Sequence, residues 1–195
     1  RKIFGTMRAA GTVIWATDLK ERKSTDGGGK GRPKTVSYSY SASFAVVLSG
    51  RPIKEVRRIW ADGKLLRGAA GDFKSATKYR LYVGSEDQAV DPLIASAEGS
   101  GQAPAFRGVA YAVFEDFELA DYGNRIPSLT FEIVAEETPV PLGTIAEILA
   151  AGDLLSADET PSFVGYAGSG DSVRGALEAL ADVVPLSLTD DGERL

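Results

Sequence analysis

The chain has 195 residues, of which 44% are hydrophobic and 25% are charged, and its formal net charge at pH 7 is −5. This balance is typical of a globular protein and excludes a fibrous or fully disordered chain. The sequence contains neither cysteine nor histidine. Disulfide frameworks, zinc sites with nitrogen or sulfur ligands, cysteine nucleophiles and histidine-based triads are therefore excluded.

The two ends of the chain differ sharply in charge. Residues 1–80 contain 18 Lys and Arg against 6 Asp and Glu, a net charge of +12, whereas residues 81–195 have a net charge of −17. Such a split is compatible with attraction between neighbouring subunits, with two faces that have different partners, and equally with two solvated faces. The aliphatic or aromatic runs, such as 44–48, are far shorter than the ~20 residues of a membrane-spanning helix, so no membrane span is expected. Since the chain begins at Arg1 without a signal-peptide pattern, we interpret it as an internal piece of a longer polypeptide.

Up to about residue 138 the sequence predicts mostly β-strands. Alternating, β-branched or aromatic segments mark the expected strands, which are 11–17, 36–48, 56–66, 79–83, 109–114 and 129–134. Asp62-Gly63 predicts a tight hairpin turn inside the third segment, because both positions of a type I′ turn need positive φ. The polar, glycine-rich segment 18–35 is expected to be a long loop.

Helices are expected at three places. Asp91 as N-cap, Pro92 in the first turn and Gly99 at the end predict a short helix. After Pro139 and Pro141, Thr144 to Glu147 reads as a capping box for a helix that stops at Gly152. A further helix is expected over 171–182, followed by a strand over 186–192 whose partner would lie beyond Leu195.

These elements predict a β-dominated α+β fold. We expect an antiparallel β-barrel or sandwich domain over residues 1–138, and a smaller helix-containing α+β segment over 139–195 that we interpret as truncated. Gly123, Asn124, Arg125 and Pro127 are expected to form a structural turn between two strands, because Gly and Asn tolerate positive φ. Trp15 and Trp60, each in a predicted strand with aliphatic neighbours, are expected in the core.

Motifs that would indicate catalysis are weak. Gly29-Lys30 resembles the end of a phosphate-binding loop, but Gly31 follows where that loop needs Ser or Thr. Asp116 and Glu118 would share one face of a strand, as the carboxylate pair of a glycosidase must, yet solvated charge is routine at a strand end. No calcium-loop spacing is present either. We therefore expect no catalytic residues, no cofactor and no metal.

Several segments together resemble the phage tail protein family found in the baseplate hub (tail-tip) proteins of siphophages and of gene transfer agents. The resemblance covers nearly all of residues 5–135 and depends on the order of its motifs: Met7 to Trp15, Tyr38 to Val46, Ile59 to Leu66, Tyr79 to Gly84, Asp91 to Ile94, Pro104 to Glu115 and Gly123 to Glu132.

The resemblance implies a structural, non-enzymatic role. Proteins of this kind form a homotrimeric ring that joins the tail tube to the tip and encloses the path of DNA during ejection. The implied partners are other copies of the chain, distal tail and tape-measure-like tail proteins, and DNA that passes without specific binding. The implied location is the tail tip of a virion or gene transfer agent particle. The iron–sulfur cluster that some hub proteins hold on cysteines does not carry over to this cysteine-free chain.

The charge split suggests how such a ring would work. A channel for DNA should repel phosphates, so some carboxylates of residues 81–195 are expected to face the lumen. The basic segment would then turn outward or onto an adjoining subunit, and its candidate assembly contacts are Lys20, Arg22, Lys23, Lys30, Arg32 and Lys34. Two alternatives remain open: a carbohydrate-binding β-domain that contacts the host surface, and a cell-wall hydrolase.

Overall fold

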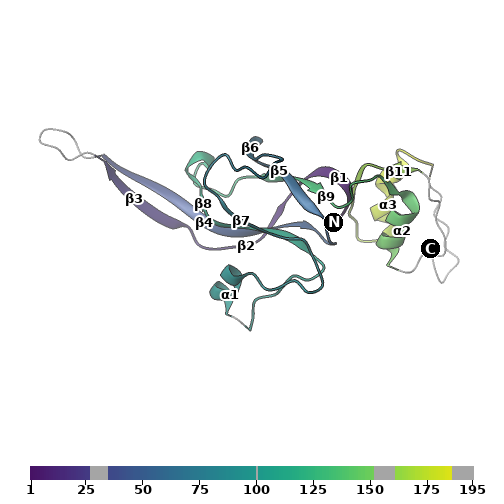
Figure 1. The fold of residues 1–195 in the computed structure, drawn as a ribbon, viewed down its shortest axis with the longest axis horizontal. Helices are drawn as coiled ribbons and strands as arrows, with labels where there is room; N and C mark the ends of the chain where they lie inside the picture. Colours follow the sequence, from purple (N-terminus) through teal and green to yellow (C-terminus); the bar gives the residue numbers. More distant parts are fainter. Residues whose placement is uncertain (27–34, 100, 152–160, 186–195) are drawn as a thin grey trace, which may run out of the picture.

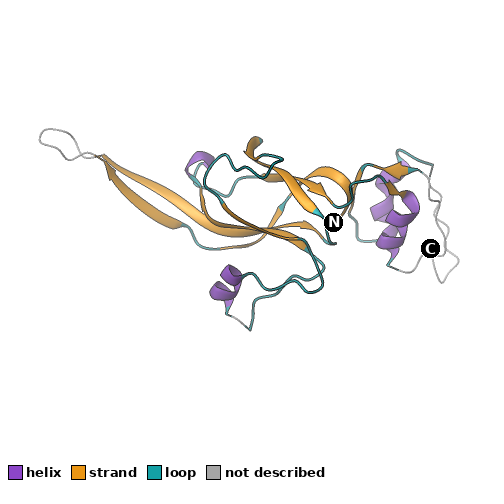
Figure 2. Ribbon diagram, viewed as in Figure 1, coloured by secondary structure: helices purple, strands orange, loops and turns teal. Residues whose placement is uncertain are grey.

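In the part of the chain that the structure describes, two antiparallel β-sheets pack face to face and three α-helices lie outside them (Figure 1; Figure 2). The computed structural model describes residues 1–26, 35–99, 101–151 and 161–185. The sheets do not close into a barrel, so the predicted β-dominated α+β class is confirmed in its sandwich form. No helix among these residues is long and apolar enough to cross a membrane.

The strands differ widely in length, and β4 (Thr35–Ser49) is the longest of those described. The strands are β1 Lys2–Ala10, β2 Thr12–Ala16, β3 Lys20–Asp26, β4 Thr35–Ser49, β5 Glu55–Ala61, β6 Lys64–Arg67, β7 Lys78–Tyr82, β8 Ala110–Glu118, β9 Leu129–Val134, β10 Val140–Pro141, β11 Ser162–Phe163 and β12 Gly165–Gly168. The helices are α1 Pro92–Glu98, α2 Leu142–Ala150 and α3 Val173–Ala181, with a 3-10 turn at Ala120–Tyr122.

Strand order places segments from both ends of the chain side by side. One sheet has the order β12-β1-β9-β5-β6, and the other has the order β2-β4-β8-β7 with β3 also paired to β4. Every one of these pairings is antiparallel. β10 and β11 form a separate two-stranded ladder. The prediction of antiparallel neighbours is thus confirmed.

The main core lies between the two sheets. Because side chains alternate along a strand, Phe44 of β4 and Phe114 of β8 face Phe131 of β9 across the sandwich. The Phe44 and Phe114 ring centroids are 5.1 Å apart, and those of Phe114 and Phe131 are 6.4 Å apart. All three side chains are fully buried, so this aromatic contact joins the sheets.

A second cluster covers the outer face of the β4 and β8 sheet. Ile94 of α1 packs there with Tyr111, whose ring stacks on Tyr82 at a centroid distance of 4.6 Å. A third cluster holds the C-terminal helices, and Phe4 of β1 is inserted into it beside Tyr166. β1 therefore contributes to both the sandwich and the C-terminal region.

Local turn and cap predictions are largely confirmed. Asp62 and Gly63 have φ values of 48° and 81° between β5 and β6, as a type I′ hairpin needs. Asp91 caps α1 by accepting hydrogen bonds from two backbone N–H groups, and Gly99 ends the helix. Asn124 lies in a turn with φ 56°, and its N–H donates to the carbonyl of Leu119.

Two of the local predictions are wrong, and one strand was not predicted. Residues 20–26 of the expected loop form β3, because β4 extends back to Thr35 and supplies a partner for every residue of that segment. β1 was not expected at all. The capping box at Thr144 is not formed, because α2 already begins at Leu142 after Pro141 and places Thr144 inside the helix. The expected helix stop at Gly152 and the strand over 186–192 lie outside the described residues.

Candidate assembly surface

A two-stranded arm projects from one end of the sandwich (Figure 1). We define the arm as β3 and the first part of β4, residues 35–40. β8 pairs with β4 only from Ser41 onward, where Ser41 faces Glu118, so the arm has no third strand among the described residues. A two-stranded ribbon is marginally stable by itself in water, which makes the arm a candidate for contact with a partner.

The two faces of the arm differ in chemistry. Cross-strand pairs place Thr25 opposite Val36, Lys23 opposite Tyr38, and Glu21 opposite Tyr40 on one face. This face continues the core-facing row of β4, since the next side chains on the same side of the strand are Ala42 and Phe44. The opposite face carries small serines with Lys20 and Arg22.

The basic residues of the arm are partly engaged within the chain. Lys20 Nζ lies 2.7 Å from Asp116 Oδ1, and Arg22 Nη1 lies 3.0 Å from Glu118 Oε1. Lys23 Nζ lies 5.8 Å from the centroid of the Tyr38 ring. Within the described residues, Lys23 forms no ion pair. The remaining candidates, Lys30, Arg32 and Lys34, lie outside the described residues.

A β-bulge in β8 aims the acidic partners at the arm. Two residues, Glu115 and Asp116, oppose the single residue Ser43 of β4, and Asp116 has φ 49°. Ser43 Oγ accepts a hydrogen bond of 3.0 Å from the Asp116 N–H. Because the bulge adds one residue, Glu115 and Asp116 both face the outer side of the sheet while Phe114 and Phe117 stay in the core. The sequence alternation could not predict this pair.

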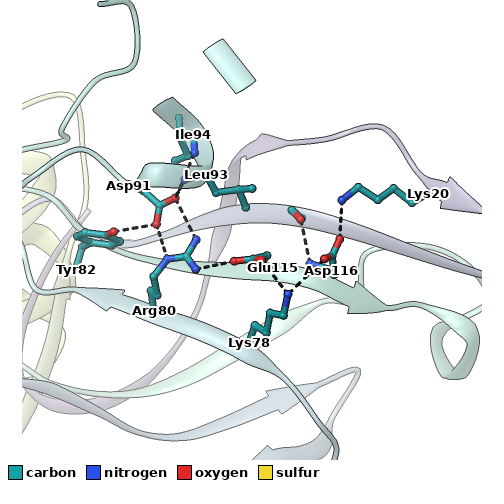
Figure 3. Close-up of polar contacts among 10 residues, drawn as sticks. Lys20, Lys78, Arg80, Tyr82, Asp91, Leu93, Ile94, Glu115 and Asp116 are labelled. Carbon is teal, nitrogen blue, oxygen red and sulfur yellow. Dashed lines mark hydrogen bonds and ion pairs between the residues drawn. The ribbon is translucent and has the colours of Figure 1, made fainter. Parts of the chain in front are cut away.

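The acidic pair is part of a continuous ion-pair network across the outer face of the sheet (Figure 3). Lys78 Nζ lies 2.9 Å from Glu115 Oε1 and 3.6 Å from Asp116 Oδ2. Arg80 Nη1 donates to Glu115 Oε2 at 2.8 Å, and Arg80 Nε donates to the buried Asp91 at 2.7 Å. The network therefore runs from the N-terminus of α1 to the base of the arm.

These contacts fix the protonation of the carboxylates. The hydrogen bond from Lys20 lowers the pKa of Asp116, and hydrogen bonds from Arg80 and Lys78 lower the pKa of Glu115. A glycosidase needs one carboxylic acid with a raised pKa to protonate the leaving oxygen. Asp116 and Glu118 do share one face, but each is paired with a cation of β3. Asp116 and Glu118 are thus held in structural ion pairs with Lys20 and Arg22.

The charge split of the sequence is partly satisfied inside the chain. Ten of the thirteen ion pairs among the described residues join a Lys or Arg of residues 1–80 to an Asp or Glu of residues 81–195. They form because basic strands such as β7 and β5 lie beside acidic β8 and β9. The charged side chains in these ten ion pairs therefore contact one another within the sandwich and are not free to bind a partner.

Both tryptophans were expected in the core and both are only half-buried. Trp15 Nε1 donates to Glu98 Oε1 at 2.8 Å, and the Arg8 guanidinium lies 3.9 Å from the centre of the Trp60 ring. The expectation is wrong because β2 is an edge strand and Trp60 lies on the outer face of its sheet. The face of Trp60 that a sugar would stack on is occupied by Arg8.

The described surface offers little for catalysis. A shallow cavity of about 340 Å³ lies beside the turn between β1 and β2, and its lining, which includes Gly11, Val13 and Pro127, has no titratable side chain. Within the described ranges, no group of three or more Asp and Glu residues could hold a metal ion. The arm and its ionic base are therefore the strongest candidate surface.

Comparison with known proteins gives one structural similarity. A solved chain of the virion of a native gene transfer agent particle matches with a TM-score of 0.66 and 29% sequence identity, over 92% of this chain. This chain spans 47% of that longer chain. No protein-family model matches the sequence, and no curated protein matches it. The match covers most of the chain, so the chain is similar to a virion component in both fold and sequence.

Proposed function

We propose that the chain is a structural, non-enzymatic component of a gene transfer agent particle or a related tailed virion. Its place is the baseplate hub at the tail tip, where three copies form a ring that joins the tail tube to the tip. The observation that carries this proposal is the similarity to a gene transfer agent virion chain over 92% of the sequence. The order of the hub-like motifs in the sequence supports the finer assignment to the tail tip.

The architecture supports a mechanical role. The arm leaves the sandwich at a base cross-linked by Lys20, Asp116 and Lys78, and the same network continues to α1. A ribbon fixed at its base keeps its direction when it contacts a neighbour, which a ring subunit requires. Residues 1–138 and 139–195 would act as two successive hub domains, with β1 connecting them through its pairing with β9 and β12.

The proposal also assigns the DNA path. Carboxylates that already form ion pairs, such as Glu115 and Asp116, are partly neutralised and repel phosphate weakly. Exposed carboxylates without an ion pair among the described residues, such as Glu86, Asp87 and Asp121, are better suited to the lumen wall. DNA would pass without specific binding, because an acidic wall disfavours contact with the polyanion. Distal tail and tape-measure-like proteins would occupy the two ends of the ring.

A labelling experiment tests this location. Cells that make the particle would express the chain with an epitope tag in the loop at Gly101, which lies on the surface. Gold-labelled antibody should then mark the distal end of the tail in purified particles. Label on the capsid, or tagged chain that is not incorporated while the untagged chain is, would contradict the proposal. Untagged particles provide the control for nonspecific labelling.

A further inference from the structure

The arm leaves a core-type face uncovered. Val36 is 41% exposed and Tyr38 is 51% exposed, although both lie in the row that continues into buried Ala42 and Phe44. Inside the sandwich this row is covered by the other sheet, which does not extend along the arm (Figure 2). Exposed large apolar side chains on a thin ribbon, here Val36 and Tyr38, are typical of surfaces that become buried by a partner.

The opposite end of the molecule has the opposite charge. We define the lobe as α2, α3 and the short strands β10 to β12; it lies at the far end of the long axis from the arm (Figure 1). The described residues of the lobe carry Glu147, Asp171, Glu178 and Asp182 against Arg174, whereas the arm carries Lys20, Arg22 and Lys23 against Glu21 and Asp26. Exposed acidic side chains of the lobe include Glu147, Asp171, Glu178 and Asp182, and none of them forms an ion pair within the described ranges.

The lobe also exposes apolar side chains. Val164 is 69% exposed and Val183 is 74% exposed, and Val183 directly follows Asp182 at the end of α3. The lobe thus combines negative charge with uncovered apolar surface, as the arm combines positive charge with Val36 and Tyr38. The two ends complement each other but cannot meet within one elongated chain.

We propose that the arm of one copy docks on the acidic lobe of a second copy, head to tail. The apolar face at Val36 and Tyr38 forms the contact, and Lys23, which has no ion pair within the described residues, steers the approach to the acidic side chains of α3. Such a contact is heterologous, so it repeats around a closed ring or continues as a filament. It deepens the proposed function, on which it rests for the expectation that the ring closes at three copies.

Two variants of the full chain separate the two ends of this contact. The arm variant carries Lys23→Glu, Val36→Ser and Tyr38→Ser, and the lobe variant carries Glu178→Lys and Asp182→Lys. All five side chains are exposed, and Lys at 182 is favourable beside the C-terminal end of α3, so both variants should fold. Leu65→Ser, at a residue 41% exposed on β6, is the matched control for loss of an exposed apolar side chain.

Sedimentation velocity measures the association of the purified chains. At a concentration where the unmodified chain associates, each variant alone should be monomeric, with an association at least about tenfold weaker, while Leu65→Ser behaves as the unmodified chain. An equimolar mixture of the two variants should form a one-to-one dimer. The reason is that the intact arm of the lobe variant fits the intact lobe of the arm variant, and no further contact is left.

Three results would overturn the inference: an unmodified chain that stays monomeric throughout, a lobe variant that still associates, or a mixture that stays monomeric. Association of the lobe variant would indicate that arms bind one another or another surface. These outcomes are independent of location in the particle, because the labelling experiment decides that separately. If the chains associated head to tail but the gold label did not mark the tail tip, this inference would stand and the proposed location in the baseplate hub would be rejected.

Discussion

Arg80 donates hydrogen bonds to both carboxylate oxygens of Asp91, from Nε to Oδ2 at 2.7 Å and from Nη2 to Oδ1 at 3.2 Å. The Asp91 side chain is fully buried, and its oxygens also accept from Tyr82 Oη and from the N–H groups that begin α1. One carboxylate thus holds a helix, an edge strand and a cation together. This contact connects α1 to the network that ends at the arm.

Asp91→Asn should lower the free energy of unfolding by about 2–4 kcal/mol, because it leaves Arg80 without its buried counter-charge and removes one acceptor. Asp91→Ala should cost more, since the N-cap of α1 is also lost. Urea unfolding followed by tryptophan fluorescence measures both. Asp121→Asn, an exposed carboxylate without an ion pair in the described structure, should stay within about 0.5 kcal/mol of the unmodified chain. A similar small effect for Asp91→Asn would contradict the role given to this residue.

Stability should fall in acid. Burial raises the pKa of Asp91, but hydrogen bonds from Arg80 and Tyr82 outweigh it, and its pKa lies below the ordinary value. Cation hydrogen bonds also lower the pKa values of Glu115 and Asp116. A carboxylate with a depressed pKa in the folded state stabilises fully above its unfolded pKa, so stability should be lost progressively below about pH 4.

The urea midpoint measured from pH 7 to pH 2 tests this. In Asp91→Asn the decline should be shallower, because one titrating group is gone. A midpoint that rises as the pH falls from 5 to 3 would show that these carboxylates do not carry the stability assigned to them.

Gly5 is required for the junction between β1 and β12. Its φ is 64°, and a Cβ built there would lie 2.1 Å from the Val164 carbonyl oxygen. Gly5→Ala should therefore destabilise the fold by about 2–4 kcal/mol through backbone strain and the clash. Amide hydrogen exchange should speed up most in β12 and α3, which depend on this junction. Gly101→Ala, where a Cβ meets nothing within 4 Å, is the control and should have little effect.

Local signals in the sequence predicted more than long-range ones. Asp62-Gly63 and Asp91-Pro92 specify a turn and a cap with side chains within a few residues, so their prediction from sequence succeeded. β3 was missed because its run of Lys, Glu and Arg has no apolar alternation, and it becomes a strand only through its partner β4. The ion-pair network was equally invisible, since it depends on the register of β7 against β8 and on the bulge at Asp116.

The purified chain should not degrade peptidoglycan or polysaccharide. Asp116 and Glu118, the carboxylates that the sequence suggested for such a reaction, are held by Lys20 and Arg22. The lowered pKa of Asp116 makes it unsuitable as a general acid. Release of reducing sugar from cell-wall preparations measures this, with lysozyme as the positive control. Turnover that disappears in Asp116→Asn or Glu118→Gln would show that the chain is an enzyme.

An averaged electron cryomicroscopy image of the intact particle, resolving this chain with its symmetry mates, tests the central claim most directly. The account predicts three copies in a ring around the DNA path at the tail tip, with each arm in contact with the next copy. A chain found on the capsid, or present at the tip as a single copy outside the axis, would contradict the hub assignment. If Lys20 and Arg22 lined the lumen, the assignment of an acidic lumen wall and an outward-facing basic segment would be wrong.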